Sequence, residues 1–156
     1  MKFRANLTAV LACLVVTTTV GMQQAPWFGT WQLKSQESAG PFSDPAYKRV
    51  TSKIEPLADG LKVTYDMVRT RGGITHLEWT GRFDGRDYPV QGMDYVLTNA
   101  YRILDDRSYE IVIKVDGQMA ATAVAVVSAD GRTLTVTTRE RRPGGQAATT
   151  AIYERK

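Results

Sequence analysis

The sequence of 156 residues predicts an all-β fold, an antiparallel up-and-down β-barrel of about ten strands, and two features carry this prediction. Apolar and polar residues alternate with a period of two through most of the chain after residue 28, which is typical of strands that bury one face. Tight-turn signals interrupt the alternation at short, regular intervals. A sustained apolar repeat at spacings of three and four residues is not found there, so no helix is predicted.

The alternation identifies individual strands. It is strongest in residues 61–68, 76–83, 109–115 and 133–137. Residues 120–127 are apolar on both faces, but the β-branched Val124, Val126 and Val127 favour a strand over a helix. Together with the turn signals, the alternation places the strands at residues 28–36, 47–55, 61–70, 74–83, 86–90, 94–104, 107–115, 118–128, 132–142 and 146–155.

Asp-Gly pairs mark most of the turns between these strands. Such pairs supply the positive φ angles of two-residue hairpin turns, and they occur at residues 59–60, 84–85, 116–117 and 130–131. Only the connection from Ser38 to Pro45 is long, and we interpret it as a loop or an extended flap. Ten short strands in an open sheet would expose two edges, so closure into a barrel is favoured. A two-sheet sandwich is the alternative, although its crossovers are normally longer than these hairpins.

The N-terminus has the layout of a secretory signal peptide. Lys2 and Arg4 precede an uncharged run from Leu7 to Val20, and Thr19 and Gly21 form a small-residue cleavage pair. We therefore divide the chain into a signal peptide, residues 1–21, and a barrel domain, residues 22–156. The protein is expected to be exported, to the periplasm or the cell exterior.

Two other interpretations of the N-terminus are an uncleaved membrane anchor and a lipid attached to Cys13. The apolar run of about 14 residues is short for a membrane span, which needs about 20. The run also continues past Cys13, whereas a lipoprotein signal would end there. Stable membrane insertion after cleavage is therefore not expected.

The net charge of +4 falls to +2 if Lys2 and Arg4 are removed with the signal peptide. A nucleic-acid-binding protein would concentrate basic charge more strongly, so no nucleic acid partner is expected. Cys13 is the only cysteine, which suits an oxidising compartment and excludes a disulfide scaffold. We expect a monomer or a weak oligomer.

The tripeptide Gly29-Thr30-Trp31 lies at the start of the first predicted strand. It resembles the G-x-W motif that opens lipocalins, fatty-acid-binding proteins and avidins, together the calycins. The resemblance implies that Trp31 closes one end of the barrel and that a basic residue late in the chain packs over it. Arg155, Arg139 and Arg141 are the candidates, with Arg155 preferred.

Residues 29–33, 83–92 and 127–136 also resemble small exported bacterial proteins described as lipocalin-like. This resemblance implies the fold and export. Together with the barrel architecture, it leads us to expect a protein that binds a small hydrophobic or amphipathic ligand, such as a fatty acid or a similar lipid, without catalysis. The chain departs from fatty-acid-binding proteins because residues 38–45 are too few for their helix pair. The alternative is a structural or interaction module of the cell envelope with a filled barrel.

Large side chains at inward positions of the predicted strands are the candidate ligand contacts. They are Tyr65, Met67, Trp79, Phe83, Tyr95, Tyr101 and Met119, accompanied by Leu97, Ile103, Ile111 and Ile113. Small residues at Ala121, Ala123 and Ala125 leave room beside them. A pocket with tyrosine hydroxyls as polar groups is one interpretation, and a fully packed core is the other.

Arg139 and Arg141 share one face of a predicted strand near a hairpin tip. We count them among the ligand contacts as a basic mouth that attracts an anionic head group, with a solvated rim as the alternative.

His76 is the only histidine, and alternation with Trp79 predicts that it is exposed. Its functional interpretation is an axial haem ligand. Neither a catalytic residue, a metal site nor a cofactor is predicted.

Overall fold

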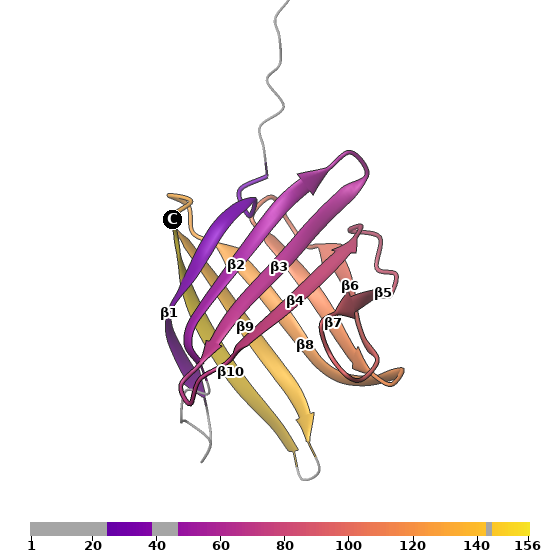
Figure 1. The fold of residues 1–156 in the computed structure, drawn as a ribbon. Coiled ribbons are helices and arrows are strands. Elements are labelled where there is room, and N and C mark those ends of the chain that lie inside the picture. Colours follow the sequence, from indigo (N-terminus) through magenta and orange to yellow (C-terminus); the bar gives the residue numbers. More distant parts are fainter. Residues whose placement is uncertain (1–24, 39–46, 143–144) are drawn as a thin grey trace, which may run out of the picture.

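The computed structural model describes residues 25–38, 47–142 and 145–156, which form a closed barrel of ten antiparallel strands (Figure 1). The strands are β1 (Gly29–Ser38), β2 (Tyr47–Leu57), β3 (Gly60–Arg69), β4 (Ile74–Gly81), β5 (Tyr88–Gln91), β6 (Leu97–Ile103), β7 (Ser108–Val115), β8 (Gln118–Val127), β9 (Thr133–Arg142) and β10 (Gly145–Arg155). Each strand pairs with its neighbours in sequence, and β1 also pairs with β10. The predicted all-β barrel is confirmed, and closure leaves the sheet without an edge.

The predicted signal peptide, residues 1–21, lies outside the described residues, as does most of the predicted loop or flap at residues 38–45. In the described part of the chain, no helix is long and apolar enough to cross a membrane.

The hairpin turns follow the chemistry of their residues. At the turn between β7 and β8, Asp116 has a φ of 49° and Gly117 a φ of 77°. Two consecutive positive φ angles define a turn whose twist matches that of the flanking strands, and Asp-Gly is a favoured pair for it. The sequence therefore determines where the chain reverses.

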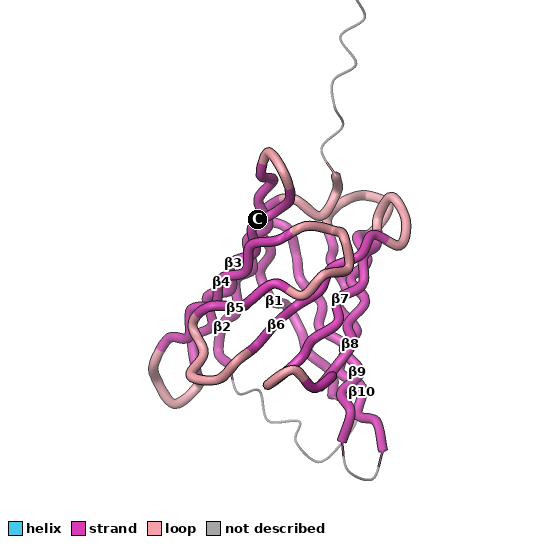
Figure 2. Tube along the Cα trace, turned by 90° about the vertical axis from the view of Figure 1, so that its right-hand side faces the viewer, coloured by secondary structure: helices cyan, strands magenta, loops and turns pink. Residues whose placement is uncertain are grey.

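The ladder between β4, β5 and β6 is much shorter than the others. Two residue pairs join β4 to β5 and two join β5 to β6, whereas ten join β9 to β10. Figure 2 shows β5 and β6 side by side between β4 and β7. The indole Nε1 of Trp79 in β4 donates hydrogen bonds of 3.2 Å to the backbone oxygens of Tyr88 in β5 and Asn99 in β6. One side chain thus joins three strands where the backbone ladder is weak.

Trp31 and Arg155 close the end of the barrel at which the described chain begins and ends. Trp31 is fully buried, and its Nε1 donates a hydrogen bond of 2.9 Å to the carbonyl oxygen of Trp27. Arg155 pairs with Trp31 across the ladder, and its guanidinium carbon lies 4.2 Å from the centroid of the Trp31 ring. The guanidinium donates to the carbonyl oxygens of Phe28 and Gly131, both at 2.7 Å, and to that of Pro26.

An aromatic cluster fills the barrel above this closed end. The ring of Phe83 lies 5.5 Å from Trp27, 5.8 Å from Tyr109 and 6.1 Å from Tyr101, measured between ring centroids. Tilted and edge-on pairs at such separations are the favourable geometries for aromatic rings. These rings form a dense floor across the barrel.

Gly81, the last residue of β4, gives space to two of the rings. A Cβ added there would lie 2.8 Å from Cη2 of Trp79 and 2.8 Å from Cδ2 of Tyr88, closer than real Cβ contacts allow. We expect Gly81→Ala to lower the free energy of unfolding by about 1–3 kcal/mol, because the well-packed rings must move. Urea denaturation followed by circular dichroism measures this loss. The same measurement on Thr80→Ala, an exposed neighbour, should show a clearly smaller change; equal losses would contradict the steric explanation.

Candidate functional site

The barrel encloses a cavity of about 350 Å³ above the aromatic floor. Every strand contributes to its wall: Gln36, Tyr47, Val50, Tyr65, Met67, Leu77, Glu78, Trp79, Val90, Leu97, Asn99, Tyr101, Ile111, Ile113, Ala123, Val136, Thr138, Glu140, Thr149, Ala151 and Tyr153. The wall is mainly apolar, with a few hydroxyl, amide and carboxyl groups. Both the size and the lining are those of small-molecule sites, which run from about 300 to 1,000 Å³.

Stacked aromatic rings form the base of the cavity. Trp79 and Tyr101 stack with ring centroids 4.0 Å apart and an interplanar angle of 26°. Tyr101 also stacks on Tyr109 at 5.6 Å and 23°. Trp79 is only 2 % exposed, and its single N–H group is shared between two backbone oxygens. The indole therefore offers the cavity a flat apolar surface and no free donor.

Buried tyrosines supply the polar groups. Burial raises the pKa of Tyr65, Tyr101 and Tyr153 above the ordinary value, and the neighbouring phenol of Tyr65 raises the pKa of Tyr101 and Tyr153 further. Burial likewise raises the pKa of Tyr109, which lies beneath them. All four phenols are neutral at physiological pH, and three of them line the cavity. A neutral phenol both donates and accepts a hydrogen bond, so the wall suits uncharged polar groups.

Asn99 in β6 carries a polar atom whose hydrogen-bonding capacity is not used. Its side-chain oxygen Oδ1 is buried and has no hydrogen-bond partner among the described residues, although Asn99 lines the cavity. An unpaired buried acceptor costs about 1–3 kcal/mol, so such atoms are normally satisfied. The oxygen has no surface open to the cavity, and the Asn99 side chain forms a hydrogen bond with Tyr101 that lowers the pKa of that phenol against the larger effect of burial.

The charged residues of the wall are acidic. Glu78 directs its carboxylate to the outside of the barrel, where it lies 2.7 Å from Nζ of Lys62. Glu140 lies on β9 toward the end opposite the aromatic floor. Among the described residues that line the cavity there is no lysine, arginine or histidine.

Four of the predicted ligand contacts, Tyr65, Met67, Trp79 and Tyr101, line the cavity. Their accompanying residues Leu97, Ile111, Ile113 and Ala123 do so as well. Ile103 was expected to point inward, but it is 48 % exposed at the end of β6. The alternation in these strands is thus a good guide to the wall, except where a strand ends.

Phe83 and Met119 lie outside the wall, contrary to the sequence-based expectation. β4 ends at Gly81, so Phe83 leaves the strand and joins the aromatic floor. Met119 is 48 % exposed because the pairing of β7 with β8 shifts between Ile113 and Lys114. An extra residue on one strand of such a bulge reverses the faces of the residues beyond it.

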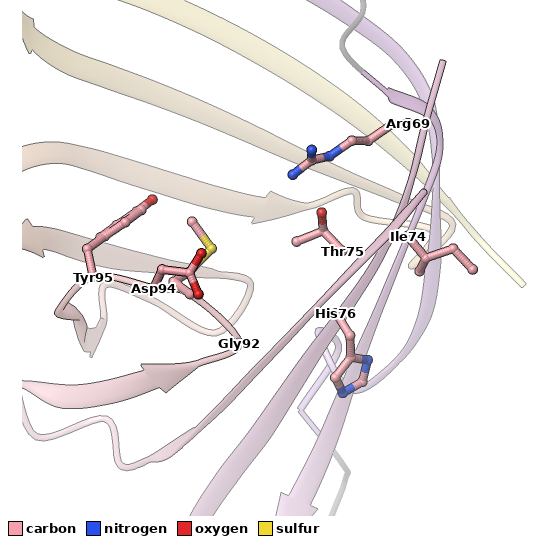
Figure 3. A pocket seen from close by; sticks show the side chains of 8 residues that line it. Arg69, Ile74, Thr75, His76, Gly92, Asp94 and Tyr95 are labelled. Carbon is pink, nitrogen blue, oxygen red and sulfur yellow. The ribbon is translucent and has the colours of Figure 1, made fainter. Parts of the chain in front are cut away.

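Tyr95 lies in the loop before β6 and lines a separate pocket of about 250 Å³ at the barrel rim. Figure 3 shows Arg69 and Thr75 on one side of this pocket and Tyr95 across from them. His76 points away from Arg69 and Thr75 (Figure 3), and its Nδ1 lies 2.7 Å from Oδ1 of Asp66 on the outside of the barrel. His76 is exposed, so the geometry does not bring it to a ligand in the main cavity.

Arg139 and Arg141 are exposed and do not line the cavity, so their role as a basic mouth stays a prediction. Thr138 and Glu140 of β9 line the cavity, and alternation directs Arg139, which lies between them, and Arg141, which follows, outward. The third predicted arginine, Arg155, takes the closure position over Trp31.

Tyr153, Asn99 and Glu140 line the cavity but were not among the predicted contacts. Tyr153 alternates with Ala151 and Thr149, a small-residue pattern that gives little indication of which face is buried. Asn99 was missed because a polar residue within a strand is normally assigned to the solvent face. In the described ranges, no group of three or more His, Cys, Asp or Glu side chains is arranged to hold a metal ion.

Comparison with known proteins finds similarity at the level of structure. No protein-family model matches the sequence, and a search of curated proteins finds no match. A fatty-acid-binding protein 1 of Echinococcus granulosus superposes with a TM-score of 0.55 and 11 % identity, covering 83 % of this chain and 97 % of that one. The zebrafish ileal bile acid-binding protein, solved with cholic acid, gives a TM-score of 0.52 and 11 % identity, covering 84 % and 99 %. The similarity shows the fold: this chain forms the same kind of closed antiparallel barrel as these two proteins, with ten strands.

Proposed function

We propose that this protein binds one small hydrophobic or amphipathic molecule, of the size of a fatty acid or a similar lipid, inside the barrel and without catalysis. The observation that carries the proposal is the cavity of about 350 Å³ with its apolar wall and three neutral phenols. A barrel that served only as an interaction module would have a filled interior, so the cavity favours binding. Burial of apolar ligand surface supplies the affinity, at about 25 cal/mol per Å² removed from water.

The similar structures support the same class of ligand. By their names, one binds fatty acids and the other binds bile acids, and both are binding proteins and not enzymes. We further propose that the protein is exported, on the basis of the signal-peptide layout of residues 1–21. N-terminal sequencing of the protein recovered from outside the cytoplasm is expected to begin at residue 22.

The fluorescence of Trp79 can be used to measure ligand binding. It is the tryptophan in the cavity wall, whereas Trp27 and Trp31 lie at the closed end. We expect titration with an uncharged apolar fluorescent probe, N-phenyl-1-naphthylamine, to quench the emission of Trp79 by energy transfer and to give a saturable, one-site isotherm. The isotherm should disappear in Ala123→Phe, because the new ring occupies the cavity.

Val124→Phe is the matched control, since it adds the same ring to the outer face of the same strand. Circular dichroism checks that both variants are folded. Equal probe binding by both variants would contradict a site in the cavity, and absence of saturable binding by the unmodified protein would contradict the proposed function.

A further inference from the structure

We infer that the pocket of about 250 Å³ at the barrel rim holds the head group of the ligand, and that this head group is a zwitterion, with an anionic group such as a phosphate and a quaternary ammonium group. This inference rests on the proposed function and narrows its ligand class. Three observations carry it: the rim pocket continues the inner wall of the barrel, one cation and one anion line it, and these two charges do not pair with each other.

The rim pocket continues the inner face of β3 and β4 beyond the wall of the main cavity. Met67 and Leu77 line that cavity, and Arg69 and Thr75 lie two residues from them, toward the end opposite the aromatic floor. Residues two apart in a strand share a face and are separated by about 7 Å. Arg69 and Thr75 are accordingly turned toward Tyr95 across the pocket (Figure 3). An amphipathic ligand whose chain fills the main cavity therefore brings its head group to the rim pocket.

Gly92 fixes the second wall of the rim pocket. Its φ is 99°, and a Cβ added there would collide with the carbonyl oxygen of His76 in β4. The loop before β6 therefore approaches β4 closely, and it places Asp94 and Tyr95 across the pocket from Arg69 (Figure 3). The volume of the pocket is below the roughly 300 Å³ at which small-molecule sites begin, so the pocket suits a head group and not a whole ligand.

Two opposite charges line the rim pocket without neutralising each other. Arg69 and Asp94 are both exposed, and the side chain of neither forms an ion pair or a hydrogen bond with another described residue. Opposite charges on the outer face of the barrel do pair, as Lys62 and Glu78 do at 2.7 Å. A singly charged head group would be attracted by one wall of the pocket and repelled by the other, whereas a zwitterion is attracted by both.

The neighbours of each charge determine which end of the head group lies on which wall. Arg69 and the hydroxyl of Thr75 supply N–H and O–H donors, and a guanidinium matches the oxygens of a phosphate in geometry. On the other wall, the carboxylate of Asp94 attracts a cation, and the ring of Tyr95 attracts a quaternary ammonium group, which cannot donate a hydrogen bond. The arrangement therefore fits a head group of the phosphocholine type.

The test compares three amphipaths with the same decyl chain as competitors of N-phenyl-1-naphthylamine: decylphosphocholine, decyl sulfate and decyltrimethylammonium, each below the concentration at which it forms micelles. Because the probe occupies the main cavity, displacement reports a ligand whose chain enters the barrel. We expect decylphosphocholine to bind about fivefold more tightly than either singly charged competitor, since an exposed ion pair changes affinity by roughly twofold to fivefold. The difference should shrink in about 0.5 M sodium chloride, which screens exposed charges.

Neutral variants of the two charges should change the affinities in opposite directions. Arg69→Gln is expected to weaken decyl sulfate and decylphosphocholine about threefold and to strengthen decyltrimethylammonium. Asp94→Asn should weaken decyltrimethylammonium and decylphosphocholine by a similar factor and strengthen decyl sulfate. Arg71→Gln and Asp116→Asn are the matched controls, because they remove the same charges from exposed turns outside the rim pocket. They should change each affinity by less than about twofold.

Two results would overturn the inference. If decylphosphocholine binds no more tightly than the singly charged competitors, the rim pocket does not recognise both charges. If Arg69→Gln and Asp94→Asn change all three affinities by the same factor, they act through the structure of the rim and not through charge. Either result leaves the proposed function intact when the uncharged probe binds saturably, whereas absence of saturable probe binding contradicts both. The comparison of competitors on the unmodified protein remains decisive even if a variant does not fold.

Discussion

Trp31→Ala is expected to lower the free energy of unfolding by about 3–5 kcal/mol, a large part of the total stability of a domain of this size. Trp31 is fully buried, its indole N–H is bonded to Trp27, and its ring carries the guanidinium of Arg155. Removal of the ring therefore leaves a void and also frees the arginine that joins β10 to the segments before β1 and β9. Equilibrium denaturation in urea, followed by circular dichroism, measures the loss.

Variants of Arg155 distinguish the stability that comes from closing the barrel from the stability that comes from an ordinary surface ion pair. Arg155→Ala is expected to cost about 2 kcal/mol because three backbone oxygens lose a charge-assisted donor. Arg155→Lys should not restore this stability, since an ammonium group cannot reproduce the planar, multidentate geometry. Lys34→Ala is the matched control: it removes a surface ion pair with Glu154 at 3.3 Å and should cost no more than about 1 kcal/mol. If Arg155→Ala costs no more than Lys34→Ala, the closure role of Arg155 is contradicted.

Alkaline pH is expected to unfold the protein steeply. Burial raises the pKa of Tyr65, Tyr101, Tyr109 and Tyr153 in the folded state, whereas these phenols ionise near pH 10 when the chain is unfolded. Above pH 10 the unfolded chain therefore binds fewer protons than the folded one, so the free energy of unfolding decreases as the pH rises. The tyrosine contribution is fully present below pH 10. Each tyrosine removes up to about 1.4 kcal/mol per pH unit above that value, or up to about 6 kcal/mol for the four.

Denaturation curves at a series of pH values from neutral to strongly alkaline test this expectation. Tyr109→Phe should reduce the alkaline slope by about one quarter, because one of the four titrations is removed. Ile111→Val, two residues along β7, should lower the stability at every pH and leave the slope unchanged, since it removes only packing. An alkaline slope that is the same in Tyr109→Phe and in the unmodified protein would contradict the assignment to buried phenols.

The strand content and the closure of the barrel could be predicted from the sequence because both depend on local patterns. Alternation marks each strand, Asp-Gly pairs mark the turns, and a run of hairpins with no long crossover favours an up-and-down barrel. Residues near the middle of long strands, such as Tyr65 and Trp79, were therefore assigned to the correct face.

The errors arose where the pattern is interrupted. The bulge between β7 and β8 turns Met119 outward, and its position depends on pairing with another strand and not on Met119 itself. Phe83 follows Gly81, the last residue of β4, so the alternation of the strand does not extend to it. In β9, Leu134 is buried and Val136 lines the cavity, and the same alternation directs Arg139 and Arg141 outward.

The polar part of the site could not be predicted, because it depends on which groups lack partners after folding. Nothing in the sequence around Asn99 distinguishes a solvent-facing amide from one whose oxygen is buried beside stacked rings. The same holds for the phenols, whose pKa values reflect the meeting of strands far apart in the chain.

The strands of the barrel are held together in two different ways, and the hydrogen bonds of Trp79 belong to the second. Around most of its circumference, long ladders hold the strands together and open only with the whole domain. β5 is held by only two residue pairs on each side and by the indole of Trp79. The free energy of opening the sheet locally at β5 is therefore lower than the free energy of unfolding the whole domain. Because the same indole forms the base of the cavity, a molecule resting on it also restrains the least cooperative part of the sheet.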